Sequence, residues 1–139
     1  MRETALATGR ERQAFISTLP TRLIDVLRQR VADTPLLPAI YAGEHNYSYA
    51  DLEKGVDAAI EVLRAAGVRA GDRVLLITEN GFSGICCLYA IFALDAWAVL
   101  ANARLTTRER DVMFDRAQPR VTICAVGESM EGHALVLPG

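Results

Sequence analysis

Lysine and paired cysteines are scarce in this 139-residue chain. Lys54 is the only lysine, although lysine and arginine together number 15. The three cysteines include the neighbours Cys86 and Cys87, and a bridge between adjacent residues is strained. An odd number without framework spacing predicts reduced thiols and therefore a cytoplasmic protein. The first residues contain no apolar run, so we expect no secretory signal.

The net charge is small, and aromatic residues are few. The net charge is −2 and aromatic residues make up 6% of the chain, without any interleaving of basic and aromatic residues. This composition argues against a nucleic-acid partner. The longest apolar stretch, residues 84–101, contains Asp95, so we interpret it as a buried helix followed by a strand rather than a membrane span. A hydrophobic fraction of 51% with 23% charged residues is typical of a globular domain.

The first half of the chain predicts two helices around a hairpin. Residues 1–20 are polar and aperiodic and predict a loose arm, so the domain itself is expected over residues 21–139. Apolar residues four apart between residues 21 and 35 predict an amphipathic helix: Leu23, Leu27 and Val31, with Ile24 beside them on the same face. Two short strands joined by a turn follow. Ser48 and Asp51 then form the capping pair of a second helix, which Gly67 ends.

The second half alternates strands with helices. Apolar strands are expected at residues 73–78, 97–102 and 120–126, each of them buried, and "ALVLP" near the end also resembles a strand. The helix between the second and third strands begins with a capping box, Thr106 and Glu109. Alternation of this kind predicts an α/β fold with a mostly parallel sheet and flanking helices.

A search for catalytic or binding patterns finds no self-contained site. Gly67 and Gly71 precede the strand at residues 73–78, whereas phosphate-binding glycines follow a strand and open a helix. Gly81 and Gly84 do follow it, but "NGFSG" has neither the dinucleotide-binding nor the P-loop spacing. We interpret it as an Asn-Gly turn with Ser83 as the helix N-cap, and keep anion binding there as the alternative.

Other reactive residue types have simple interpretations. His45 and His133 have no partner at metal-ligand spacing, so solvated histidines are expected. The adjacent cysteines lie in an apolar helix and are expected to be inert core thiols. Tyr89 and Trp97 are expected in the core. We assign no catalytic, cofactor-binding or metal-binding residue within the chain.

The segment "YSYADLEKGVDAAIEVLRAAGVRAGDRVLLITEN" resembles the N-terminal region of the adenylate-forming, AMP-binding ligases of the acyl-CoA synthetase superfamily. Its matches to the family pattern are Tyr47, Ser48, Tyr49, Asp51, Leu52, Leu63, Gly67, Val68, Gly71, Asp72, Arg73, Val74, Glu79 and Asn80. Further matches follow at Asn102, Arg104, Leu105 and Thr106, so the resemblance covers about residues 21–126. Asp95 and Ala101 depart from the family's usual Gly and Pro.

The resemblance implies the partial first subdomain of the ligase fold. A complete enzyme of this family converts a carboxylic acid substrate and ATP into an acyl-adenylate, then into a coenzyme A thioester, with Mg²⁺ as cofactor. The family's phosphate loop, its Tyr-Gly-x-Thr-Glu stretch and its catalytic lysine are not found here, and Lys54 lies outside both lysine motifs. We therefore expect a scaffold that is inactive alone and binds none of these cofactors tightly.

Two other functions stay open. The chain is either a non-catalytic interaction module that complements a separately encoded remainder, or a stand-alone nucleotide-binding α/β domain that uses "NGFSG". For an isolated scaffold we also expect an uncovered sheet edge, uncovered apolar helix surface and self-association.

Overall fold

The computed structural model describes residues 8–125 and 134–138. The helices are α1 (Gly9–Thr18), α2 (Leu23–Asp33), α3 (Tyr49–Ala65), α4 (Phe82–Ala93) and α5 (Thr107–Ala117). The strands are β1 (Pro38–Ala42), β2 (His45–Ser48), β3 (Arg73–Thr78), β4 (Trp97–Asn102), β5 (Val121–Ala125) and β6 (Ala134–Pro138). Within this part of the chain, no helix has the length and apolar character needed to cross a bilayer.

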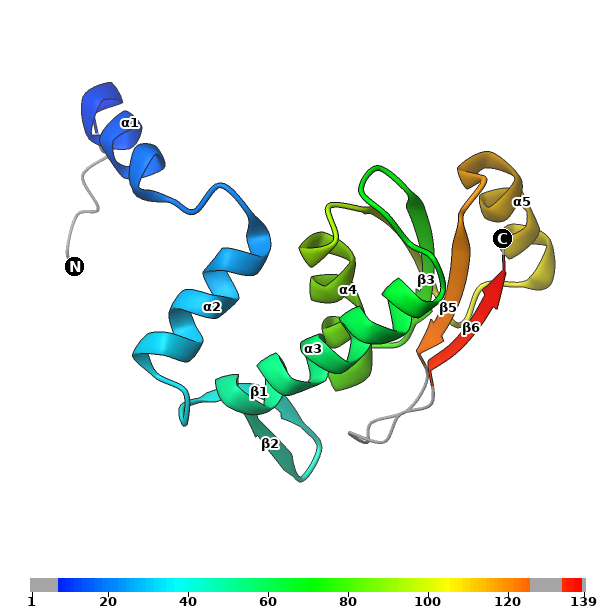
Figure 1. Ribbon diagram of the computed structural model, residues 1–139, viewed down its shortest axis with the longest axis horizontal. Coiled ribbons are helices and arrows are strands. Elements are labelled where there is room, and N and C mark those ends of the chain that lie inside the picture. Colours follow the sequence, from blue (N-terminus) through cyan, green and yellow to red (C-terminus); the bar gives the residue numbers. More distant parts are fainter. Residues whose placement is uncertain (1–7, 126–133, 139) are drawn as a thin grey trace, which may run out of the picture.

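The main sheet has the strand order β4-β3-β5-β6 (Figure 1). β3 pairs in parallel with both β4 and β5, and β6 runs antiparallel to β5. β1 and β2 form a separate antiparallel hairpin next to α3. The predicted α/β fold with a mostly parallel sheet is therefore confirmed.

β3 is the centre of the core because its side chains are buried on both faces. Val74 and Leu76 belong to the larger apolar cluster, together with residues of α2, α3 and α4. Leu75 and Ile77 point to the opposite face, where residues of α5 pack. The prediction of a strand buried on both faces is confirmed for β3, and the helices lie on the two sides of the sheet as right-handed crossovers require.

α3 begins and ends at the residues that the sequence predicts. The Ser48 hydroxyl accepts a hydrogen bond from the Asp51 backbone N–H, and the Asp51 carboxylate accepts one from the Ser48 backbone N–H at 3.0 Å. Gly67 adopts a φ of +80°, and the N–H of Val68 donates to the carbonyl of Leu63 at 3.0 Å. This pairing is a Schellman motif, which needs the left-handed conformation that glycine adopts without strain.

β4 differs from the buried strand that the sequence predicts. It lies at the edge of the sheet, where Trp97 is 68% exposed and Leu100 is 56% exposed. The expectation of a core position for Trp97 is therefore wrong. Its apolar sequence is that of a central strand, but within the described structure only β3 pairs with it. On the predicted apolar face of α2, Ile24 and Leu27 are buried, whereas Leu23 is exposed, so the prediction is wrong for Leu23 alone among these three.

The N-terminal segment contains a helix where the sequence predicts an aperiodic arm. α1 is held by a capping box, in which the Thr8 hydroxyl accepts from the Glu11 N–H and the Glu11 carboxylate accepts from the Thr8 N–H. None of its residues is buried, and it lies apart from the sheet (Figure 1). Local capping rather than burial explains this helix, and such capping carries no apolar periodicity.

Candidate functional site

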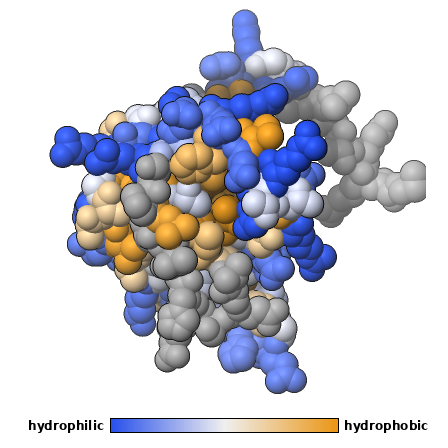
Figure 2. All heavy atoms as spheres, turned by 90° about the vertical axis from the view of Figure 1, so that its right-hand side faces the viewer, coloured by the Kyte–Doolittle hydropathy of each residue, from blue (hydrophilic) through white to orange (hydrophobic). Residues whose placement is uncertain are grey.

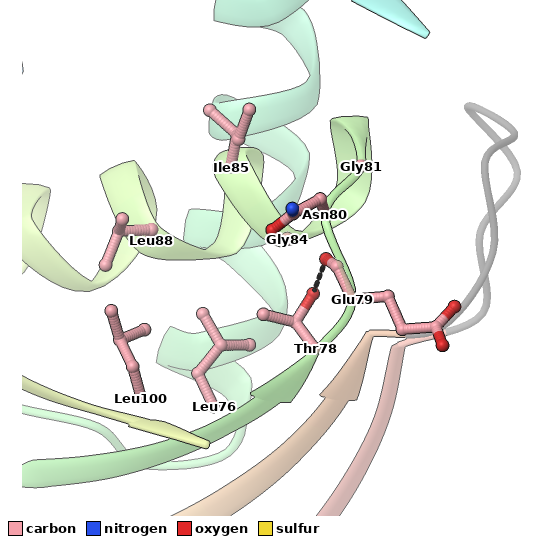
Figure 3. Close-up of a pocket in the computed structure, with 9 residues that line it drawn as sticks. All are labelled: Leu76, Thr78, Glu79, Asn80, Gly81, Gly84, Ile85, Leu88 and Leu100. Carbon is pink, nitrogen blue, oxygen red and sulfur yellow. Dashed lines mark hydrogen bonds between the residues drawn. The ribbon is translucent and has the colours of Figure 1, made fainter. Parts of the chain in front are cut away.

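The carboxyl end of β3 opens into a pocket beneath the start of α4. The pocket has a volume of about 270 Å³. Apolar side chains from β3, α4 and β4 face one another inside it, and the polar residues of the β3–α4 loop form its rim (Figure 3). It is lined by Leu76, Thr78, Glu79, Asn80, Gly81, Gly84, Ile85, Leu88 and Leu100. Ligands of open α/β sheets bind at the carboxyl ends of the strands, so this is the place to test for a site.

Thr78 fixes the end of β3 through its hydroxyl group. The Thr78 Oγ1 lies 2.7 Å from the carbonyl oxygen of Glu79 and 3.0 Å from that of Ala125, at the end of β5. One hydroxyl proton is shared between the two acceptors. The carboxyl ends of two neighbouring strands are thereby joined by a side chain of the protein itself.

Gly84 is required by the close approach of α4 to this threonine. A Cβ atom at residue 84 would collide with the Thr78 hydroxyl and would lie 3.3 Å from the carbonyl oxygen of Glu79. The space that a missing side chain leaves at Gly84 is therefore filled by Thr78. In a phosphate loop, the same space admits the anion to the backbone N–H groups.

The start of α4 differs from the expected turn. Gly81 is the N-cap, with an extended backbone and no side-chain hydrogen bond, so Ser83 lies within the first helical turn and the prediction of Ser83 as the cap is wrong. Phe82 accounts for the earlier start, since it is 2% exposed and its ring stacks on Tyr47 with centroids 4.0 Å apart. Burial of this aromatic ring outweighs the preference for a serine cap.

The rim of the pocket carries exposed polar groups. The Arg104 Nε lies 3.8 Å from the Glu79 carboxylate, and both side chains are more than half exposed. The backbone N–H of Arg104 donates to the Asn102 side-chain oxygen at 2.8 Å, which shapes the turn after β4. In Figure 3 the Glu79 side chain points away from the apolar interior. The pocket itself therefore suits an apolar group, with weak polar contacts at its mouth.

A second hollow lies on the opposite face of the sheet, beside α5. Its volume is about 240 Å³, and it is lined by Leu75, Ile77, Thr107, Arg110, Asp111, Phe114, Thr122, Cys124 and Leu137. The Thr122 hydroxyl is buried without a hydrogen-bond partner in the described structure. Figure 2 shows apolar side chains at the surface on this side of the molecule, near α5, β5 and β6. α5 thus covers its face of the sheet incompletely.

The cysteines occupy the inert positions that the sequence predicts. Cys86 and Cys87 are buried in α4 and unbridged. Burial raises the pKa of the Cys86 thiol to about 12, with the neighbouring Cys87 adding to the shift, and burial raises the pKa of Cys87 to about 11. Both thiols are protonated at neutral pH and poor nucleophiles.

The histidines do not form a metal centre in the described residues. The His45 ring stacks against Tyr47 with centroids 6.4 Å apart. His133 lies outside the described residues. Over residues 8–125 and 134–138, no three His, Cys, Asp or Glu residues come together as a metal site.

Comparison with known proteins assigns the family. The family model described as "AMP-binding enzyme" matches residues 27–137, which is most of the chain. The chain belongs to the AMP-binding enzyme family. It is 31% identical over 119 residues to a 2-succinylbenzoate–CoA ligase from Geobacillus kaustophilus, covering 84% of this chain and 24% of the relative. It is 33% identical over 100 residues to the enzyme of the same name from Bacillus cereus, covering 72% of this chain and 20% of the relative.

Solved structures give the same assignment. The N-terminal domain of FACL13 from Mycobacterium tuberculosis matches with a TM-score of 0.71 and 29% identity, over 76% of this chain and 27% of that domain. A fatty acyl CoA synthetase from Mycobacterium tuberculosis matches with a TM-score of 0.70 and 30% identity, over 74% of this chain and 21% of the other. The chain thus corresponds to part of the N-terminal region of acyl-CoA ligases and spans about a quarter of the curated relatives' length.

Proposed function

We propose that this chain is the N-terminal scaffold of an ATP-dependent ligase that joins a carboxylic acid to coenzyme A. The relatives named above are 2-succinylbenzoate–CoA ligases and a fatty acyl CoA synthetase, so the proposal includes both kinds of acid. The supporting observation is that several family-pattern residues hold the fold together, while those at the pocket form only its exposed rim: Glu79, Asn80, Asn102 and Arg104.

Four of these residues illustrate the structural roles. Tyr47 is buried and stacks on the first residue of α4, and Asp51 caps α3. Gly67 ends α3 in a left-handed conformation. The Asp72 carboxylate accepts a hydrogen bond from the Arg69 backbone N–H at 2.8 Å, which closes the turn into β3. Each contact fixes where β3 enters the sheet, and so where its carboxyl end lies.

ATP, Mg²⁺ and coenzyme A would be held mainly by groups outside these residues. The chain supplies the β3–α4 loop and its apolar pocket, which suits part of an acyl group better than a phosphate, because Gly84 is filled by Thr78. Adenylation depends on preorganised charged donors around the phosphates. At the described pocket the charged rim is the carboxylate of Glu79 with the guanidinium of Arg104.

ATP–pyrophosphate exchange tests this proposal. The purified 139-residue chain is assayed with 2-succinylbenzoate, aromatic acids and fatty acids, and exchange at background is expected. A full-length 2-succinylbenzoate–CoA ligase serves as the positive control, and circular dichroism shows whether the same sample is folded. Exchange above background by a folded chain would contradict the scaffold role.

The stand-alone nucleotide-binding alternative has a separate test. Titration with ATP or AMP, followed by amide chemical shifts, would move the signals of residues 81–84 if the β3–α4 loop binds a phosphate. Because Thr78 occupies the space above Gly84, we expect these signals to stay in place.

A further inference from the structure

The hollow beside α5 has a floor made of side chains from three neighbouring strands. Thr122 of β5 is in register with Leu75 of β3 and with Leu137 of β6, so the three side chains form one row on the same face of the sheet. Ile77 and Cys124 are in register in the next row. No residue of α5, the helix on this face, is buried, so the hollow of about 240 Å³ stays open.

The Thr122 hydroxyl is the unusual group in this floor. The residue is 6% exposed, and its Oγ1 has no hydrogen-bond partner in the described structure. Its neighbours across the sheet are the leucines of β3 and β6, and the backbone of β5 is paired with both of these strands. The carbonyl groups of β5 are therefore engaged in the sheet. A buried hydroxyl proton without an acceptor lowers the stability of the folded chain, so its presence calls for an explanation.

We propose that this hollow is a binding site for a small, mostly apolar molecule that carries a carbonyl or ether oxygen. The apolar part of the ligand lies against Leu75, Ile77 and Phe114. The ligand's oxygen accepts the hydrogen bond for which the Thr122 hydroxyl has no acceptor in the protein. Because Oγ1 is closed to solvent in the free chain, binding requires that Thr122 turns about χ1 to another staggered rotamer, which presents the hydroxyl to the ligand.

The size and the rim of the hollow set the chemical class of this ligand. A volume of about 240 Å³ is below the roughly 300–1,000 Å³ of sites for drug-sized molecules, so the ligand has about ten non-hydrogen atoms. Arg110 and Asp111 place opposite charges at the rim, and the Arg110 Nη2 donates to the Thr107 Oγ1 at 3.3 Å. The rim has no excess of either charge, which favours an uncharged ligand. For a molecule of this size, a Kd of about 1 mM is expected.

Titration with acetophenone, followed by NMR of the methyl groups, tests the site in the 139-residue chain. Acetophenone consists of an aromatic ring with a carbonyl group, and α-methylstyrene has the same shape with a methylene group in place of the oxygen. Acetophenone is expected to cause saturable shifts of the methyl signals of Leu75, Ile77 and Thr122. α-Methylstyrene serves as the matched ligand that lacks the acceptor.

Thr122→Val removes the hydroxyl and keeps the shape of the side chain. This variant is expected to weaken acetophenone binding by about fivefold, whereas α-methylstyrene binds no more weakly than before. It is also expected to raise the melting temperature of the free chain, because an unpaired buried hydroxyl is lost. Thr21→Val is the matched control, since Thr21 is exposed and lies outside the hollow, and it is expected to change neither affinity.

Cys124 provides a second measurement within the hollow. Its thiol is partly exposed, whereas Cys86 and Cys87 are buried, so iodoacetamide reacts with Cys124 first in the folded chain. Acetophenone at about three times its Kd leaves about a quarter of the sites free and is expected to slow this alkylation about fourfold. Mass spectrometry of the digested chain gives the rate at each cysteine.

Three results would overturn the proposal. The first is a titration with acetophenone that produces neither saturable shifts nor protection of Cys124. The second is an acetophenone affinity that Thr122→Val lowers no more than Thr21→Val does. The third is a lower melting temperature for Thr122→Val than for the unchanged chain, which would mean that the hydroxyl has a partner within the protein. The site does not depend on ligase activity, so the exchange assay and this titration test separate claims.

Discussion

At Gly55, α3 packs tightly against α4, and Gly55→Ala tests this packing directly. A Cβ atom at residue 55 would lie 2.5 Å from the Cys86 Sγ and 3.0 Å from the Phe82 Cε1. Cys86 is 4% exposed and Phe82 is 2% exposed, so neither side chain can move into solvent. The added methyl group therefore has to be accommodated by a shift of one helix against the other.

Two opposing contributions determine the expected change in stability. Alanine in a helix interior is favoured over glycine by about 1 kcal/mol. Insertion of a methyl group into a packed contact costs about 1–3 kcal/mol. The contact with Cys86 is far inside the ordinary van der Waals distance, so we place Gly55→Ala in the upper part of that range. A net destabilisation of about 1–2 kcal/mol is expected.

The helix-propensity contribution can be measured separately in α3. Ala58 is exposed, so Ala58→Gly changes propensity without a packing contact and is expected to cost about 1 kcal/mol. Urea unfolding followed by circular dichroism gives the free energy of unfolding for both variants. If Gly55→Ala is neutral or stabilising, the steric reasoning is wrong.

A double-mutant cycle assigns the steric conflict to a particular atom. Cys86→Ala removes the Sγ atom that the new methyl group meets. In the Cys86→Ala background, Gly55→Ala is expected to be less destabilising by about 1 kcal/mol, because the two residues are in direct contact. Additive effects of the two substitutions would show that the sulfur atom is not the obstacle.

Two further predictions concern pH and backbone strain. Hydrogen bonds from the Ser48 hydroxyl and backbone N–H lower the pKa of Asp51 below the usual value of an aspartate, about 3.9. Its stabilising effect is therefore present above about pH 4 and is lost as the pH falls through the lowered folded-state pKa. Asp51→Asn is expected to reduce this acid-dependent loss in urea unfolding measured from pH 6 to pH 2, and an unchanged pH profile would contradict the capping role. Asp95 has a φ of 54° and accepts a hydrogen bond from Arg22 at 2.8 Å. Asp95→Gly and Asp95→Ala both remove that ion pair, but only alanine retains the strain, so thermal unfolding should show Asp95→Ala less stable by about 1 kcal/mol, and equal stabilities would refute the strain.

Local signals in the sequence predicted the elements that local chemistry determines. The capping pair Ser48 and Asp51 and the left-handed Gly67 depend on neighbours a few residues away. The parallel sheet followed from the alternation of strands and helices. These features carry a periodicity or a residue type that only one local conformation satisfies well.

Long-range neighbours decided the features that the sequence did not predict. "WAVLAN" has the composition of a buried strand, yet β4 is an edge, because β5 returns to the other side of β3. The sequence of β4 does not determine which strands lie beside it in the sheet. The same holds for Gly84, whose closeness to Thr78 is set by how α4 packs across the strand end. Sequence spacing argued against a phosphate loop, and the structure adds that Thr78 lies in the space beside Gly84.

The position of Thr78 bears directly on what this edge of the sheet can bind. The carboxyl ends of parallel strands usually face a ligand, and here Thr78 joins the ends of β3 and β5 through the carbonyls of Glu79 and Ala125. The carbonyl oxygens of Glu79 and Ala125 therefore have a hydrogen-bond donor within the protein. A ligand at this edge has the apolar pocket and the exposed rim available to it. Phosphate chemistry at such an edge needs charged donors from outside the described residues, and that requirement is the physical reason for proposing a scaffold.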